Sequence, residues 1–65
     1  MQQFEYLTLR VRERGFIGKR VNPKKLNKSL NELGQEGWEL SSSFETHEDD
    51  GETKDVFLIF KRPLS

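Results

Sequence analysis

Apolar and polar side chains alternate along residues 4–14, the first patterned segment of this chain. Leu7, Leu9 and Val11 fall on one face of the segment, and mainly threonine and arginine side chains fall on the other. A period of two in a run rich in strand-forming residues is typical of a β-strand with one buried face. The pattern therefore predicts a strand over residues 4–14.

A helical period follows, because three leucines form one apolar stripe at positions i, i+4 and i+7: Leu26, Leu30 and Leu33. Asn22 is a favoured N-cap residue, and Pro23 suits the first helical position. Gly37 supplies a stop, since glycine readily takes the left-handed conformation that ends many helices. These signals predict a helix between Asn22 and Gly37. Gly34 lies inside it, and a close approach of the helix to the sheet would explain this glycine.

Two more strands are predicted after the helix. The first alternates polar residues with four residues that we expect to share one face: Trp38, Leu40, Ser42 and Phe44. Residues 47–52 indicate a turn with Asp50-Gly51 at its pivot. Residues 56–60 are apolar on both faces, which favours a central strand that is buried from both sides.

The expected fold is one α+β domain over residues 1–65, with the element order β-α-β-β. The doubly apolar strand takes the middle of a three-stranded antiparallel sheet, so the strand order is 1-3-2, and the helix covers one face. The other face keeps an apolar patch: Phe57 and Ile59 beside Phe4 and Tyr6. Such a patch on a small soluble domain usually marks an interface. We therefore expect self-association, through this face or through the edge of the first strand.

Size and composition favour the same conclusion. A chain of 65 residues buries only about 60% of the surface of its unfolded form, so small domains commonly add disulfides, a metal or oligomerisation. The chain has no cysteine and one histidine, which argues against disulfides and a zinc site. No apolar run approaches the roughly 18 residues of a membrane helix, and no signal peptide opens the chain. We expect a cytoplasmic protein without a cofactor, a metal or a membrane partner.

Charge is unevenly distributed although the net charge is zero. Residues 1–28 carry eight Lys/Arg and two Glu, whereas residues 29–65 carry three Lys/Arg and nine Asp/Glu. This asymmetry could steer an anionic partner to one end, or let opposite ends of two subunits attract each other. Both interpretations stay open.

Several short runs carry a family resemblance: Phe4-Glu5-Tyr6, Gly15-Phe16-Ile17-Gly18-Lys19, Asn22-Pro23, Leu30-Asn31-Glu32-Leu33-Gly34, Glu36-Gly37-Trp38-Glu39-Leu40 and Phe60-Lys61-Arg62-Pro63. With them the chain resembles a bacterial and phage family catalogued as domain of unknown function four-one-seven-seven. The resemblance covers nearly the whole chain, and the Glu-Gly-Trp-Glu-Leu run is its most specific part. It implies a small soluble cytoplasmic domain and brings no assigned activity.

The basic segment around the loop Gly15 to Gly18 is the strongest functional signal. Its arginines occupy every second position of the predicted strand and so share one face. The backbone N–H groups of the loop and the N-terminus of the following helix could approach an oxyanion. The guanidinium group of arginine can donate two parallel hydrogen bonds to a phosphate, and aromatic rings can stack on a base. Only two residues separate the glycines, so the loop is not a Walker A sequence. A solvated basic surface is the plain alternative. The candidate ligand-binding residues are Tyr6, Arg10, Arg12, Arg14, Phe16, Lys19 and Arg20.

Other notable residues favour structural interpretations. Trp38 suits core packing. His47 lies in an acidic turn and lacks the orienting partner and nucleophile that catalysis requires. The acidic hairpin also misses the spacing of a calcium loop. We expect no catalytic residue and no enzyme activity.

Two functions from different classes follow. The basic loop narrowly favours a non-catalytic homo-oligomer that binds or sequesters a phosphate-bearing small ligand, a nucleotide, through the loop and the subunit interface. The alternative is a protein–protein interaction module, an adaptor or inhibitor of a host protein, that uses the open sheet face or edge. Zero net charge disfavours nucleic acid as the partner.

Overall fold

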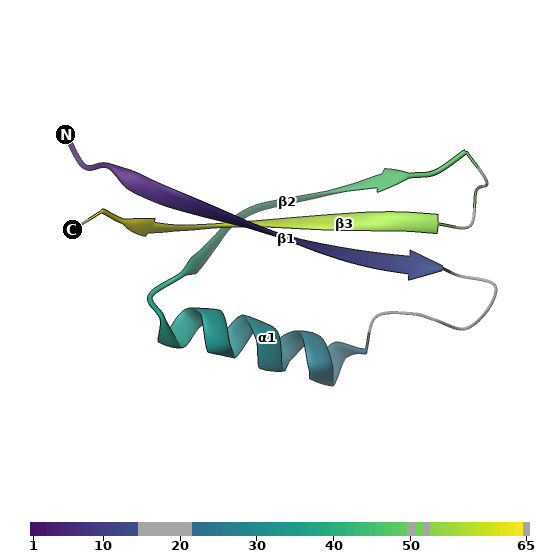
Figure 1. Cartoon of the computed structure of the whole chain (residues 1–65), viewed down its shortest axis with the longest axis horizontal. Coiled ribbons are helices and arrows are strands. Elements are labelled where there is room, and N and C mark those ends of the chain that lie inside the picture. The colour runs from purple at the N-terminus through teal and green to yellow at the C-terminus, as the bar shows by residue number, and fades with distance from the viewer. Residues whose placement is uncertain (15–21, 50, 52, 65) are drawn as a thin grey trace.

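The computed structural model describes residues 1–14, 22–49, 51 and 53–64. The elements follow one another as β1 (Phe4–Arg14), α1 (Pro23–Gln35), β2 (Glu39–His47) and β3 (Thr53–Pro63). The strands form an antiparallel sheet in the order β1-β3-β2, which confirms the predicted α+β class and strand order. Figure 1 shows the sheet nearly edge-on with α1 along one side, and no described element lies on the other side.

The central strand β3 supplies the core. β1 pairs with it over all eleven residues without a register shift, so Leu7 lies opposite Phe60 and Leu9 lies opposite Leu58. Residues directly opposite each other point to the same face of a sheet. Phe60 and Leu58 are the buried apolar residues of the described chain, at 3% and 9% exposure. The three leucines of the α1 stripe remain half-buried.

Both ends of α1 are set by local sequence signals, as predicted. The Asn22 side chain accepts a hydrogen bond from the backbone N–H of Lys24 at 2.9 Å, which caps the first turn. At the other end Gly37 has φ +90°, and its N–H donates to the Gly34 carbonyl at 3.0 Å. The N–H of Trp38 donates to the Leu33 carbonyl at 3.0 Å, and the two bonds together form a Schellman motif.

Gly34 does not mark a close approach of helix to sheet. A methyl group built at this position meets no heavy atom within 4 Å, and the residue is exposed. Our explanation of this glycine from packing was therefore wrong, and nothing in the described structure requires a glycine there.

A β-bulge changes the faces of β2. Leu40 lies opposite Phe60 and Ser42 opposite Ile59, so Ser41 is an extra residue in the ladder. Leu40 consequently shares the helix side of the sheet with Phe60, whereas Phe44 lies opposite Phe57 on the other side. The prediction that Trp38, Leu40, Ser42 and Phe44 share one face was wrong, because the bulge inverts the alternation between Leu40 and Ser42.

The β2–β3 turn uses the predicted glycine. Gly51 has φ +72°, and its N–H donates to the Glu48 carbonyl at 3.1 Å. The Glu48 N–H closes the hairpin on the Thr53 carbonyl at 2.9 Å. Asp50, the other half of the predicted pivot, lies outside the described residues.

The molecule is elongated and thin. Its principal extents are 45 × 25 × 10 Å and its Cα radius of gyration is 14.1 Å. A compact domain of this length has a radius of gyration of about 11 Å. One helix laid along a long, narrow sheet produces this shape.

Candidate functional site: the open face of the sheet

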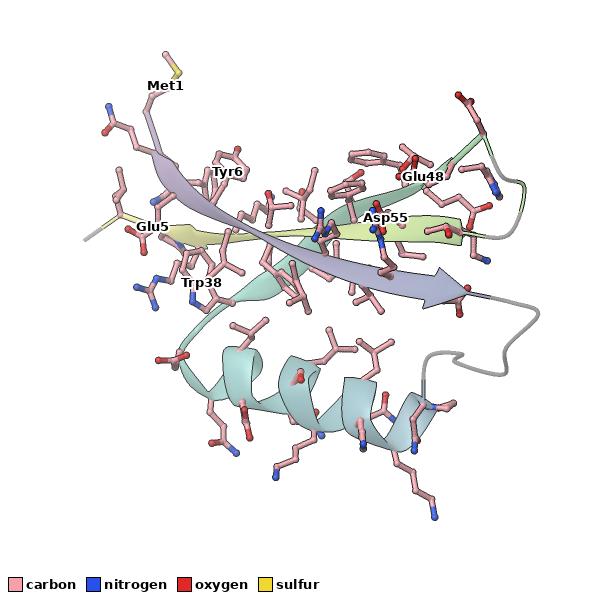
Figure 2. The ribbon with its side chains drawn as sticks, turned by 45° about the vertical axis from the view of Figure 1, so that its right-hand side comes forward. Met1, Glu5, Tyr6, Trp38, Glu48 and Asp55 are labelled. Atoms are coloured by element: carbon pink, nitrogen blue, oxygen red, sulfur yellow. The ribbon has the colours of Figure 1, made fainter. Side chains whose placement is uncertain are left out.

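The side of the sheet away from α1 has no covering element in the described chain. Two observations identify it. Arg62 donates to the Glu36 carbonyl at the end of α1, so the even-numbered residues of β3 face the helix and the odd-numbered ones face away. Figure 2 shows Tyr6, Asp55 and Glu48 on this far side and Trp38 on the helix side. We call this surface the open face, and its residues are Phe4, Tyr6, Thr8, Arg10, Arg12, Glu39, Ser42, Phe44, Thr46, Asp55, Phe57, Ile59 and Lys61.

An aromatic pair forms the middle of the open face. The rings of Phe44 and Phe57 stack across β2 and β3 with centroids 5.0 Å apart and an interplanar angle of 16°. Phe44 is 50% exposed and Phe57 is half-buried. Arg10 of β1 lies opposite Phe57 of β3, so the three strands together present a cation beside two stacked rings.

One end of the open face combines aromatic rings with a charged pair. The Lys61 Nζ lies 4.7 Å from the centroid of the Phe4 ring, a cation–π contact. The same Nζ lies 3.9 Å from a carboxylate oxygen of Glu39. Tyr6 lies opposite Lys61 and is 64% exposed. The Tyr6 ring is therefore mostly accessible, whereas Phe4 is half-buried.

The other end of the open face is closed by an ion-pair network. Arg12 donates from Nε to Asp55 Oδ1 at 2.8 Å and from Nη2 to Asp55 Oδ2 at 3.0 Å, a bidentate pair. Its Nη2 also lies 3.3 Å from a Glu48 carboxylate oxygen. Asp55 is only 6% exposed, and the Arg12 hydrogen bonds hold its pKa below the ordinary value, with smaller help from the charges of Arg12 and Arg10.

A second ionic cluster lies on the helix side at the same end of the sheet. Lys54 Nζ lies 3.0 Å from Glu13 and 3.6 Å from Glu45, and His47 lies 3.5 Å from Glu45. The hydrogen bond and charge of Glu13, followed by Glu45, raise the pKa of Lys54. Arg12 thus pairs the basic first half of the chain with Asp55 of the acidic second half, whereas Lys54 of the second half pairs with Glu13 of the first half.

The structure brings together part of the predicted ligand-binding set. Tyr6, Arg10 and Arg12 lie on one face of β1, as predicted from their period of two, but the guanidinium of Arg12 is bound to Asp55. Arg14 lies opposite Thr53 at the end of β1. The remaining three predicted residues lie outside the described residues: Phe16, Lys19 and Arg20.

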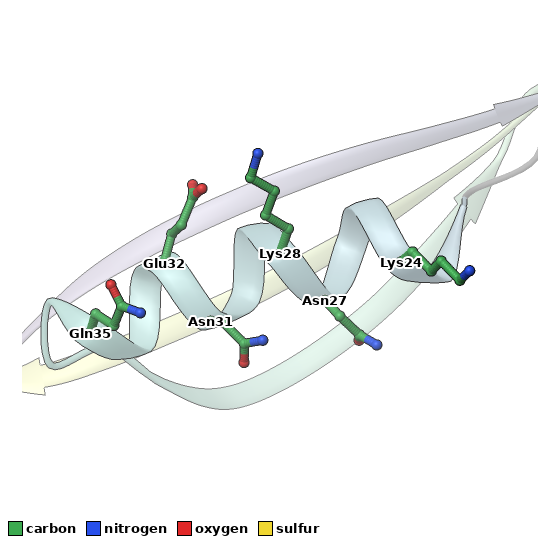
Figure 3. A pocket seen from close by; sticks show the side chains of 6 residues that line it. All are labelled: Lys24, Asn27, Lys28, Asn31, Glu32 and Gln35. Atoms are coloured by element: carbon green, nitrogen blue, oxygen red, sulfur yellow. The ribbon is translucent and has the colours of Figure 1, made fainter.

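Two hollows lie elsewhere on the described surface. One of about 250 Å³ lies between β1 and α1 and is lined by apolar residues of both elements and by Arg12, Asn22 and Lys25. The other, of about 600 Å³, follows the polar side of α1 and is lined by helix residues alone (Figure 3). Its lining residues are Lys24, Asn27, Lys28, Asn31, Glu32 and Gln35. The first hollow places Arg12 of β1 and Lys25 of α1 on one lining, although the Arg12 guanidinium donates to Asp55.

Sequence reasoning missed Phe44 as a member of the open face. Its partner Phe57 was assigned correctly, but the bulge that moves Phe44 beside it gives no periodic signal in the sequence. Trp38, predicted as a core residue, is half-buried and carries the Arg62 guanidinium on its ring at 4.2 Å.

Within the described ranges no group of three histidine, cysteine or acidic residues could hold a metal ion. The helix found there is also too short and too polar to span a bilayer.

The fold and the open face define a class: a small two-layer α+β domain with one helix, whose three-stranded sheet has one uncovered, aromatic face. A family model described as Domain of unknown function (DUF4177) matches residues 4–63, so the chain belongs to this family. Comparison with curated proteins gave no match, and neither did comparison with solved structures.

Proposed function

We propose that this chain is a non-catalytic, cytoplasmic protein–protein interaction module and that the open face is its binding surface. The observation that carries the proposal is the uncovered row of aromatic side chains on one face of the sheet. Tyr6 and Phe44 are 64% and 50% exposed there, and Phe44 already stacks on Phe57. Exposed tyrosine and phenylalanine side chains supply the anchors of many protein interfaces.

The charges of the open face support a protein partner. Arg12 is bound to Asp55 and Glu48, and Lys61 is paired with Glu39. Such pairing leaves a mixed surface of rings, hydroxyls and neutralised charge, and a strong positive field would be needed to attract nucleic acid. A mixed polar rim around an aromatic centre is the ordinary composition of a protein interface.

Site-specific photocrosslinking in the cells that produce the protein tests the proposal. A benzophenone amino acid replaces Tyr6 on the open face in one variant and Leu40 on the helix side in a control variant of similar exposure, 64% against 53%. We expect defined protein adducts from position 6 and few from position 40. Equal adducts from both positions, or none from position 6, would overturn the proposal.

A phosphate-bearing small ligand, a nucleotide, is the second candidate, and Arg10 favours it. Arg10 is exposed, lies opposite Phe57, and has no carboxylate hydrogen bond within the described part of the chain. A guanidinium beside exposed rings suits a ligand that carries both phosphate and a base. In this case the ligand would lie on the open face, and copies of the chain would enclose it.

Native mass spectrometry separates this candidate from the first. Protein purified at low salt would carry extra mass that is lost on denaturation, and added ATP would bind as a probe. Arg10→Glu should abolish ATP binding, whereas Lys28→Glu, the matched charge reversal on the outer side of α1, should retain it. No extra mass and no ATP binding in the wild-type protein would eliminate the nucleotide candidate.

A further inference from the structure

We propose that the occupant of the open face is the open face of a second copy of this chain, packed sheet on sheet about a two-fold axis. This inference rests on the function proposed above and names the partner. A second sheet at the usual spacing of about 10 Å would convert a two-layer domain with one bare face into a four-layer α-β-β-α dimer.

The exposed area of the chain has the size that a dimer would remove. The chain exposes 5273 Å², whereas a compact monomer of its mass of 7.7 kDa exposes about 4300 Å². The excess is close to the roughly 800 Å² that each partner buries in an interface of standard size. The elongated, thin shape of the molecule has the same origin, since half of the sheet surface lacks a covering layer.

The core also requires a second layer. Only Leu58 and Phe60 are buried apolar residues in the described chain, and no side chain there is fully buried. Both lie on the helix side of β3, while Phe57 and Ile59 on the open face remain half-buried. With no cysteine in the chain, disulfides do not compensate for this small core, and a second copy would cover these side chains.

The pattern of the open face favours one orientation of the two-fold axis. Consider an axis that lies between the two sheets, runs perpendicular to the strands and passes over Leu58. Phe57 then faces Ile59 of the second copy, and Lys61 faces Asp55 of the second copy. On β1 the same axis places Tyr6 over Arg12 of the second copy, since these residues lie opposite Lys61 and Asp55. Opposite charges and a cation–π pair then meet across the interface.

An axis along the strands is disfavoured by the same residues. It would place each β3 residue over its own copy, so Lys61 would face Lys61. Like charges opposed in an interface are unfavourable. The antiparallel arrangement avoids this contact and brings the apolar side chains of β3 together at its centre.

Sedimentation equilibrium of the intact chain over a range of concentrations tests the proposal. Leu40 and Phe44 provide a matched pair, because they lie on the same strand with 53% and 50% exposure but on opposite faces. We expect Phe44→Glu to raise the dimer dissociation constant about tenfold or more, an energy above 1 kcal/mol that marks important interface residues. Leu40→Glu should leave the constant within a factor of about three. Circular dichroism verifies that both variants are folded.

Cysteine crosslinking with a short bismaleimide tests the orientation, because facing residues of two sheets about 10 Å apart lie beyond the reach of a direct disulfide, and the absence of native cysteine gives a clean background. A mixture of Thr8→Cys and Arg10→Cys chains should crosslink for the axis that crosses the strands. A mixture of Thr8→Cys and Ser42→Cys should crosslink instead for an axis along the strands.

The outcomes separate this inference from the function on which it rests. A wild-type monomer at the highest soluble concentration overturns the dimer, and so does a dimer that Leu40→Glu disrupts and Phe44→Glu does not. If the wild-type chain is a monomer and position 6 crosslinks to a different protein, the interaction module stands and the second copy is replaced as its partner. Crosslinking of Thr8→Cys with Ser42→Cys overturns the antiparallel orientation.

Discussion

Arg62 stacks its guanidinium on the ring of Trp38, with its Cζ 4.2 Å from the ring centroid. The same guanidinium donates from Nη1 to the Glu36 carbonyl at 2.6 Å and from Nε to the Glu5 carboxylate. Arg62 belongs to β3, Glu5 to β1, and Glu36 is the C-cap of α1. One side chain therefore connects the end of the helix to two strands, and it gives a structural role to the Glu-Gly-Trp-Glu-Leu run.

Removing this connection should destabilise the fold. We expect Arg62→Ala to lower the free energy of unfolding by about 1–3 kcal/mol, since it loses charge-assisted hydrogen bonds and a cation–π contact together. Arg62→Lys should recover less than half of the loss, because an ammonium lacks the planar fork that stacks and donates to two groups at once. Urea denaturation followed by circular dichroism measures both variants. Full recovery by lysine would show that charge alone matters at this position.

Two glycines three residues apart should respond in opposite directions to the same substitution. Gly37 has φ +90°, so Gly37→Ala should lower the free energy of unfolding by about 1–2 kcal/mol. Gly34 is helical, exposed and free of close neighbours, so Gly34→Ala should raise it by about 0.5–1 kcal/mol. Thermal unfolding of the two variants beside the wild type checks the signs. A loss of stability in Gly34→Ala would mean that this glycine has a role that its surroundings do not reveal.

The sequence signals that predicted the fold are local ones. The alternation in β1, the Asn22-Pro23 start, the Gly37 stop and the Gly51 turn each act within a few residues, and all are present in the structure. The strand order followed from one further step, because the doubly apolar segment of β3 needed cover on both faces.

The features that sequence did not predict depend on pairing between distant residues. The bulge at Ser41 arises from the register of β2 against β3, and it moved Phe44 to the open face. The Arg12–Asp55 pair joins residues 43 positions apart, so the arginine stripe resembled a free basic surface in the sequence. Such choices are decided by which side chains meet across the sheet, and one sequence does not encode them as a periodic pattern.

The bulge gives a third prediction. Deleting Ser41 would leave a regular ladder in which Leu40 still lies opposite Phe60 and Phe44 still lies opposite Phe57, on opposite faces of the sheet, so stability should stay near that of the wild type. Deleting Ser41 and Ser42 together would instead put Leu40 and Phe44 on the same side of β2, so one of them would lose its apolar neighbour, Phe60 or Phe57. Each is about half exposed, so the loss should be roughly half the value of a fully buried side chain, about 1 kcal/mol. Urea denaturation measures both deletions, and a larger loss in the single deletion than in the double one would contradict this register.

The Arg12–Asp55 pair predicts an acid-sensitive component of stability. The pKa of Asp55 lies below its ordinary value of 3.8 because Arg12 hydrogen-bonds to the carboxylate. Between the folded pKa and 3.8 the unfolded chain binds more protons than the folded chain, so this contribution is complete above 3.8 and is lost as the pH falls through the folded pKa.

The stability difference between wild type and Asp55→Asn should therefore be present at neutral pH and shrink as the pH falls below 3.8. Urea denaturation at a series of pH values measures it. The Arg12→Gln background is the control: without the guanidinium that lowers the pKa of Asp55, Asp55→Asn should change the pH profile much less. A difference between wild type and Asp55→Asn that stays constant from neutral to acidic pH would contradict the assignment. The Arg12 hydrogen bonds would then contribute to the shape of the open face without coupling stability to the charge of Asp55.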